Sequence, residues 1–290
     1  MNGVTLRIAF ALLVAGVGLV AAPIGVGLLT GIDRRVTARL QSRRGPPLVQ
    51  PFYDVLKLLG KETTVSNRVQ IFAAWTYCLS AAAAVVLFCL GADLLLVFFV
   101  QATGSVFLVV GAMSAPSPFS QIGAQRELIQ VLAYEPLLIL VFVGMYLATG
   151  TFGLSAIRAY PRPLLLELPL LYIVLGFALT IKLRKSPFDF STSHHGHQEI
   201  VKGVLTEYSG PFLALTEIAH WYETALVLGI CALFWAPSAW IAMALVASTY
   251  AVEIVVDNVT ARVTWRWMFR YAFTAGLVFS AANIAWLYAR

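Results

Sequence analysis

The sequence has 290 residues, of which 60% are hydrophobic and only 12% are charged. Soluble domains are about one-quarter charged, so this composition indicates lipid as the solvent and argues against two soluble domains of this combined length. The three cysteines, Cys78, Cys89 and Cys231, lie in apolar stretches without C-x-x-C spacing, which argues against a zinc or iron–sulfur site built from them.

Long apolar runs follow one another along the chain. A bilayer core about 30 Å thick needs about 20 apolar residues per helix. The first run, Ile8 to Ile32, carries no charge and lacks a cleavage pattern, so we expect a retained helix. The sequence therefore predicts an all-α, polytopic transmembrane bundle of about eight helices in a single domain, 1–290. The expected segments are 8–31, 69–91, 94–114, 128–149, 164–183, 211–233, 237–256 and 268–288.

The first long connection, residues 33–68, contains prolines that forbid one continuous helix. These are Pro46, Pro47 and Pro51. From Phe52 to Leu59 the apolar residues recur at helical spacing, which predicts a short amphipathic helix at the membrane surface. The connection either holds another subunit against the membrane or serves only as a basic anchor.

The next two predicted helices form a hairpin, because Asp93 is the only charge between Arg68 and Arg126 and marks its turn. The fourth helix carries Glu135 directly before Pro136. A charge at a helix centre costs about 2.5–3.5 kcal/mol on insertion scales, so intramembrane acids are expected to face a cavity or a partner. The fifth helix begins near Glu167, which either has such a role or reaches out to the outer surface.

The second long connection, residues 184–210, holds three of the four histidines within four positions. A metal site there would need a further ligand, for which Asp189 and Glu199 are the local candidates. The alternative is a loop that docks a partner protein or handles protons, since histidine titrates near neutral pH.

The last three predicted helices contain further acids. Glu217 and His220 are three residues apart and therefore share one face of their helix, whereas Glu223 is turned away from Glu217 by about a third of a circle. Glu223 is also a candidate for snorkelling to the outer surface. Glu253 lies within the following segment.

The basic residues are distributed unevenly over the two sides. With the N-terminus outside, most of the 20 Lys and Arg fall on the inner side, which predicts both termini on the outer side. The net charge of +6 is then an inner-surface charge, which suits anionic lipid and acidic partner subunits and requires no nucleic acid.

The two long connections carry motifs that resemble subunit 1 of respiratory NADH–quinone oxidoreductase. In the first connection these residues are Asp33, Arg34, Arg35, Arg43, Arg44, Gly45, Pro46, Leu48 to Phe52, Asp54, Lys57, Leu58, Lys61 and Glu62. In the second they are Ser186 to Asp189, Glu199 to Val201, Gly203, Glu207, Tyr208, Gly210 and Pro211. The resemblance covers nearly the whole chain.

Three departures from the respiratory pattern favour one branch of this family. The connection between Gly45-Pro46 and Gln50-Pro51 is shorter than in the respiratory subunit, histidines replace an acid-rich stretch, and Lys182 replaces an acid. In these features the chain resembles the membrane subunit of energy-converting nickel–iron hydrogenases, and a quinone site is not expected.

The resemblance implies a membrane anchor without a redox centre of its own, in the plasma membrane of a prokaryote. Nickel–iron and iron–sulfur centres would belong to hydrogenase-type large and small subunits, and antiporter-like membrane subunits would be further partners. The implied docking residues are Arg34, Arg35, Arg43, Arg44, Gly45, Pro46, Gln50, Asp54, Lys57, Pro187, Phe188, Asp189, His194, His195 and His197. The implied proton-coupling residues are Asp33, Glu127, Glu135, Glu199, Glu207, Glu217 and Glu253.

Several functions remain open from the sequence. The chain either couples electron transfer to H⁺ or Na⁺ movement or is a passive anchor. A quinone-reducing relative and a stand-alone transporter are two further possibilities. A transporter would favour broken helices in two matching halves, and the sequence shows no such pairing.

Overall fold

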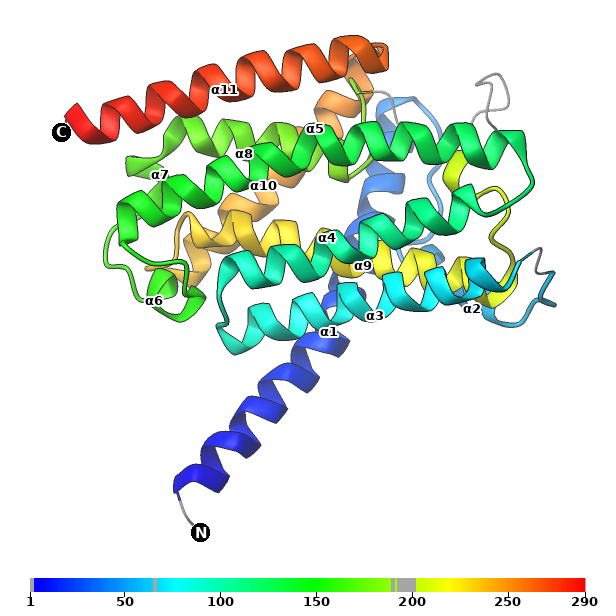
Figure 1. The fold of residues 1–290 in the computed structure, drawn as a ribbon, viewed down its shortest axis with the longest axis horizontal. Helices are drawn as coiled ribbons and strands as arrows, with labels where there is room; N and C mark the ends of the chain where they lie inside the picture. The colour runs from blue at the N-terminus through cyan, green and yellow to red at the C-terminus, as the bar shows by residue number, and fades with distance from the viewer. Residues whose placement is uncertain (1–2, 65–66, 189–190, 192–201, 290) are drawn as a thin grey trace.

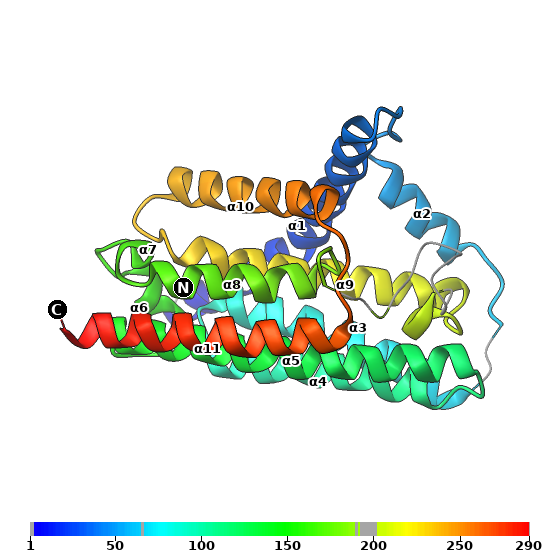
Figure 2. The ribbon, with the colours of Figure 1, turned by 90° about the horizontal axis from the view of Figure 1, so that it is seen from above.

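The computed structural model describes residues 3–64, 67–188, 191 and 202–289. Within these ranges the chain forms a bundle of helices and contains no β-strand (Figures 1 and 2). The α-helices are α1 Gly3–Leu40, α2 Gln50–Leu59, α3 Arg68–Leu90, α4 Leu94–Met113, α5 Pro118–Thr149, α6 Leu154–Arg158, α7 Leu164–Glu167, α8 Pro169–Lys182, α9 Gly210–Leu233, α10 Ala239–Val259 and α11 Trp265–Ala289, and a short 3₁₀ turn, η1, spans Gly203–Leu205.

Six of these helices are long and apolar enough to cross a membrane. They are α1, α3, α4, α5, α10 and α11. The two other predicted segments are also helical, with 164–183 covered by α7 and α8 and 211–233 by α9. The predicted polytopic all-α architecture is therefore confirmed.

Three of the larger departures from the predicted segments have a local reason. Helix α1 continues to Leu40 because the first proline after it is Pro46, so the acid and arginines at 33–39 are helical instead of lying in a loop. Helix α5 starts at Pro118, since proline suits the first helical position. The segment 164–183 is interrupted at Leu168 because Pro169 disfavours a helical residue before it.

The predicted hairpin at Asp93 and the predicted short helix after Pro51 are both present, and the position of that helix at the membrane surface stays a prediction. Gly91 ends α3 with a φ of 77°, a left-handed conformation that glycine adopts without strain, and the Asp93 carboxylate accepts the Leu95 N–H at 2.9 Å to begin α4. Helix α2 buries Val55, and Phe52 contacts Trp221 of α9 edge to face at 5.5 Å.

The helices lie side by side with their connections gathered at two ends. Helix α3 packs on α4 and α9, and α11 packs on α5 and α8. The N-terminal part of α1 projects away from the bundle (Figure 1). Both chain ends lie towards the end that carries α6 and α7, and α2 lies at the opposite end, called here the α2 end (Figure 2). The side of the membrane that each end faces stays a prediction.

Candidate functional site

Three cations lie at and just after the end of α8, and each binds an acid on a different helix. The Lys182 Nζ lies 3.0 Å from a Glu223 oxygen on α9. Arg184 lies 3.5 Å from Glu127 on α5. Lys185 lies 2.7 Å from Asp33 on α1. The end of α8 therefore ties three neighbouring helices together by charge.

The backbone after α8 explains how adjacent cations reach separate acids. Helix α8 ends at Lys182, and Arg184 has a φ of 54°, in the left-handed region that non-glycine residues rarely occupy. Such local strain persists where the surroundings hold it, and it often marks functional sites. Here it turns the chain sharply, so the side chains at 182, 184 and 185 diverge.

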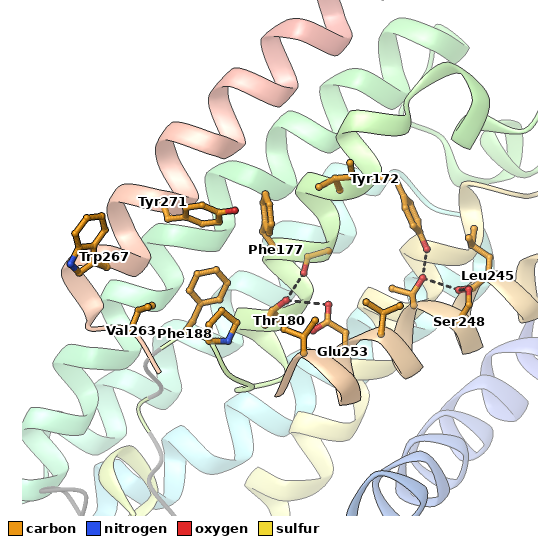
Figure 3. A pocket seen from close by; sticks show the side chains of 16 residues that line it. Tyr172, Phe177, Thr180, Phe188, Leu245, Ser248, Glu253, Val263, Trp267 and Tyr271 are labelled. Carbon is orange, nitrogen blue, oxygen red and sulfur yellow. Dashed lines mark hydrogen bonds between the residues drawn. The ribbon is translucent and has the colours of Figure 1, made fainter. Parts of the chain in front are cut away.

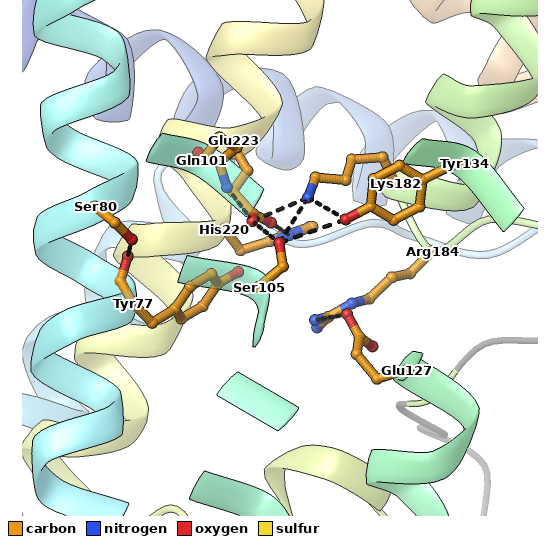
Figure 4. A network of polar contacts seen from close by, with 10 residues as sticks. All are labelled: Tyr77, Ser80, Gln101, Ser105, Glu127, Tyr134, Lys182, Arg184, His220 and Glu223. Carbon is orange, nitrogen blue, oxygen red and sulfur yellow. Dashed lines mark hydrogen bonds and ion pairs between the residues drawn. The ribbon is translucent and has the colours of Figure 1, made fainter. Parts of the chain in front are cut away.

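The Lys182–Glu223 pair is the centre of a buried polar network (Figure 4). The exposed fractions of the two side chains are 7% and 4%. Lys182 Nζ also donates to Tyr134 OH at 2.9 Å and to Ser105 Oγ at 3.3 Å, so all three of its protons are used. Gln101 Nε2 donates to the same Glu223 oxygen. Three residues from two further helices thus hold the ion pair away from water.

Arg184 and Glu127 form a second pair that is slightly more exposed, with exposed side-chain fractions of 14% and 10%. The hydroxyl of Ser191 donates to the other Glu127 oxygen. Burial alone would lower the pKa of Arg184, but the neighbouring Glu127 carboxylate outweighs this effect and holds the pKa above its ordinary value. Arg184 therefore remains charged at any physiological pH.

A polar cavity of about 480 Å³ opens between α1, α2, α9 and α10 at the α2 end. Asp33, Glu217 and His220 lie in its wall together with Lys185. His220 Nδ1 is 3.7 Å from Glu223 Oε2 and has no hydrogen-bond partner within the described part of the chain. His220 therefore stands between the cavity and the buried network.

Glu135 and Glu217, two of the predicted proton-coupling residues, both lie near the buried network. Glu217 lies in the cavity wall, on the same side of the network as His220. Glu135 lines a small space of about 20 Å³ beside Lys182 and Gln101, and its Oε1 has no partner in the described structure. The two acids thus flank the network from different sides.

Glu253 and Glu207 lie apart from the polar cavity and the buried Lys182–Glu223 network. Glu253 on α10 accepts a hydrogen bond from Thr180 Oγ1 at 3.1 Å, on another side of α8 from Lys182. Glu207 is half-buried before α9, near Thr64. Proton-coupling roles for both acids, and for Asp33 and Glu127, stay predictions.

The predicted docking residues of the first connection are mostly exposed at the α2 end. Asp54 binds Arg34 at 2.6 Å and accepts from Gln50 at 2.9 Å. Partial burial acts to raise the pKa of Asp54, but the hydrogen bonds from these two residues outweigh it and hold the pKa below its ordinary value. The side chains of Arg35, Arg43, Arg44 and Lys57 are exposed, and Gly45 and Pro46 are half-buried.

Only part of the second predicted docking segment can be placed. Phe188 is buried, with its ring 6.4 Å from that of Tyr271, and the carbonyl of Pro187 accepts the Val263 N–H at 2.7 Å. This start of the segment is therefore fixed to α11. The other predicted residues there, Asp189, His194, His195, His197 and Glu199, lie outside the described residues. Among the described residues no cluster of His, Cys, Asp and Glu could hold a metal ion.

Sequence reasoning missed the centre of the network. The interpretation in which Glu223 snorkels to the surface is wrong, because Glu223 is only 3% exposed and pairs with Lys182. The expectation that an intramembrane acid faces a partner applies to it instead. Glu167 lies at the α6–α7 end, beside Tyr160 and Arg162. A basic residue at 182 in place of an acid was the signal that could have pointed to a buried pair.

Comparison with known proteins shows which family the chain resembles. A family model described as NADH dehydrogenase matches residues 13–288. Hydrogenase-4 component C of Escherichia coli is 33% identical over 207 residues, covering 66% of this chain and 64% of that protein. Formate hydrogenlyase subunit 4 of Escherichia coli is 31% identical over 202 residues, covering 63% of this chain and 64% of that protein. The match thus spans 64% of the length of each of these two relatives.

Two further comparisons extend the similarity. NADH-ubiquinone oxidoreductase chain 1 of Arabidopsis thaliana is 27% identical over 232 residues, covering 73% of this chain and 70% of that protein. A chain in the structure of the membrane-bound sulfane sulfur reductase, an archaeal respiratory membrane complex, shares the fold with a TM-score of 0.85 and 23% identity, over 96% of this chain and 99% of that one. The chain therefore belongs to the NADH dehydrogenase subunit 1 family of membrane proteins.

Proposed function

We propose that this chain is the membrane subunit of a hydrogenase-type oxidoreductase complex, where it anchors the soluble redox module and couples electron transfer to the movement of H⁺ or Na⁺. The observation that carries this proposal is the row of ionisable side chains from the polar cavity to the buried Lys182–Glu223 pair. Two Escherichia coli relatives of this chain also support the proposal, because their names describe a hydrogenase component and a formate hydrogenlyase subunit.

The row begins in the cavity and needs one gap to be closed. At 3.7 Å the His220–Glu223 contact is too long for a hydrogen bond. A small rotation of the imidazole, or one bridging water, closes it. An imidazole ring has two nitrogens that can each bind a proton, so His220 can receive a proton in the cavity and pass it to Glu223. Glu217, in the same cavity wall, supplies the acid at the entrance.

The row continues beyond the ion pair towards Glu135. The space beside Lys182 measures about 20 Å³, and one water needs roughly 10–15 Å³ together with polar partners. Glu135 Oε1 and Gln101 Oε1 are both buried there and have no hydrogen-bond partner among the described residues. One water in this space would donate to both oxygens and so connect Glu135 to the network, because Gln101 donates to Glu223. A proton that neutralises Glu223 would release Lys182 from its ion pair. Each proton that arrives therefore changes the interactions around Glu135.

We expect Glu217→Gln and Glu135→Gln to uncouple the complex. Glutamine keeps the shape and hydrogen bonding of the side chain but removes the proton that titrates. Hydrogen evolution from a reduced dye should remain largely intact, whereas the ion gradient formed per hydrogen should fall at least several-fold. The measurement uses a pH-sensitive and a potential-sensitive dye in sealed vesicles, with and without Na⁺, since each charge moved through 100 mV requires about 2.3 kcal/mol.

The matched control is Glu167→Gln, which makes the same change at the α6–α7 end, outside the row. Its gradient per hydrogen should equal that of the wild type. An unchanged ratio in both Glu217→Gln and Glu135→Gln would support the passive anchor instead. Strict dependence of turnover on added quinone, in quinone-depleted membranes, would favour a quinone-reducing function.

The anchoring role rests on the exposed basic side chains at the α2 end. Arg43→Glu with Arg44→Glu reverses two charges there and should release the soluble module from membranes at moderate salt. The reversed charges would repel an acidic partner surface, and salt screens the charged contacts that remain at the interface rim. Sedimentation of membranes and activity in the supernatant measure the release. Arg158→Glu with Arg162→Glu reverses two charges at the opposite end and should leave the module attached. Full retention in both double variants would refute docking at the α2 end.

A further inference from the structure

A second cavity lies on the far side of α8 from the ion pair. It is a groove of about 610 Å³ between α8, α10 and α11 (Figure 3). This volume is in the range of small-molecule sites, which are about 300–1,000 Å³. Phe177, Phe188 and Tyr271 line one part of it, and Tyr172 lies towards its other end (Figure 3). The groove is thus wide enough and apolar enough for one lipophilic molecule.

One carboxyl group interrupts the apolar wall. Glu253 is 5% exposed, and its Oε2 is buried with no hydrogen-bond partner among the residues that the structure describes. An unsatisfied buried polar group costs about 1–3 kcal/mol, and native proteins retain few of them. Thr180 contacts only the other oxygen, Oε1, at 3.1 Å. A molecule bound from outside the chain can therefore supply the hydrogen-bond partner of Oε2.

The chemistry of that partner follows from the Thr180 hydroxyl. Its oxygen lies 2.9 Å from the Gly176 carbonyl and 3.1 Å from Glu253 Oε1. Oε2 is an acceptor without a donor whenever it carries no proton itself. This holds both when Thr180 donates to an ionised Glu253 and when a protonated Oε1 donates to Thr180 while Thr180 donates to Gly176.

The position of the groove decides where the donor comes from. Val252 and Trp267 in its wall have exposed fractions of 59% and 60%, and they lie on membrane-spanning helices. A ligand therefore enters from the hydrocarbon. The described residues that line the groove include no Lys, Arg or His. A phosphate headgroup would find no cation there and would face the Glu253 carboxyl, which disfavours an anionic lipid.

We propose that the groove between α8, α10 and α11 binds one membrane-dissolved lipophilic alcohol or phenol, whose hydroxyl donates a hydrogen bond to Glu253 Oε2. The apolar body of the ligand fills the space between the aromatic side chains. The site is separate from the polar cavity at the α2 end and does not depend on ion translocation by this chain.

The test compares two photoreactive probes in native membranes that hold the whole complex. One probe is a long-chain diazirine alcohol, and the other is its methyl ether, which has no donor. A hydrogen bond to a carboxyl group should favour labelling of α8, α10 and α11 peptides by the alcohol about tenfold. Competition by a long-chain aliphatic alcohol and by an alkylphenol distinguishes the two sources of the hydroxyl. Equal labelling by both probes, or none by either, would overturn the proposal.

Two variants test whether the probes are bound in the groove and whether Glu253 is the acceptor. Glu253→Leu removes the acceptor and should reduce the alcohol-to-ether ratio to about one. Gly176→Leu fills the groove, since a Cβ at Gly176 meets no atom within 4 Å, and both probes should lose their labelling. The matched control is Gly25→Leu on α1, where an added Cβ also meets nothing within 4 Å and where the wild-type pattern should persist. Unchanged labelling in Gly176→Leu would show that the probes bind elsewhere.

Discussion

Two ion pairs in this molecule have the same chemistry but opposite surroundings. Lys182 and Glu223 expose 7% and 4% of their side chains, and hydrogen bonds with residues of two further helices hold them in place. Arg34 and Asp54 expose 46% and 43% at the α2 end. An exposed pair is worth about 0–1 kcal/mol, whereas removing one partner of a buried pair costs several times more. The two pairs have similar N···O distances, 3.0 and 2.6 Å, so the difference in their expected contributions comes from burial.

The comparison also suggests why the buried pair exists. A buried ion pair is weak evidence for stability, because apolar residues of equal volume often serve as well. Ionisable residues inside a membrane more often mark a pathway for ions or protons. The Arg34–Asp54 pair instead fixes α2 to the end of α1, next to the exposed arginines. The first pair fits coupling, and the second fits the placement of a docking surface.

The largest effect is expected when the buried pair is split. Lys182→Met leaves the Glu223 charge without its cation and should lower the free energy of unfolding by about 3–5 kcal/mol. The measurement is unfolding by SDS in mixed micelles. Lys182→Met with Glu223→Gln removes both charges and should recover most of the loss. Equal losses in the single and double variants would show that packing around Lys182, not charge, holds the site.

A smaller effect is expected at the second pair. Arg184→Met strands Glu127, but Ser191 still donates to that carboxylate and both side chains are more exposed, at 14% and 10%. We expect a loss of about 1–3 kcal/mol. Arg184→Lys keeps the charge and should recover more than half of it in the same SDS titration. A loss as large as that of Lys182→Met would contradict the ranking by burial.

Much of the fold follows from patterns that a sequence displays directly. Apolar runs predicted every long helix, and the prolines together with the apolar spacing predicted α2. The errors fell where one residue decides locally. Residues 33–40 were assigned to a loop because they are charged, although no proline ends α1 before them. Pro169 divided a run that hydrophobicity alone made continuous.

The site was harder to predict because it depends on contacts between distant segments. Glu217 and His220 were paired by helical spacing, which is local information. The Lys182–Glu223 contact joins α8 to α9, and Ser105 and Tyr134 come from two further helices. No periodicity indicates which lysine meets which acid. The divergence of Arg184 and Lys185 from Lys182 depends on the left-handed conformation at Arg184, which no sequence pattern indicates.

The smallest effect, and the sharpest contrast, concerns the pH and salt dependence of the exposed pair. The pKa of Asp54 lies below its ordinary value of 3.8. A lowered folded-state pKa means that the pair contributes its stability above the pKa of the unfolded chain and loses it as the pH falls through the folded-state value. The difference in stability between wild type and Arg34→Gln should therefore stay constant from about pH 5 to 8 and shrink below about pH 4.

This difference should be at most about 0.5 kcal/mol, because solvent screens a pair that is nearly half exposed. Raising the ionic strength to about 1 M should reduce it further, since the Debye length falls to roughly 3 Å. The loss caused by Lys182→Met should hardly change in the same salt, because its charges are shielded from ions by the surrounding helices. SDS titrations of both variants at low and high salt make the comparison. A salt response of equal size at the two pairs would mean that water reaches Glu223, and the distinction between a coupling pair and a surface pair would fail.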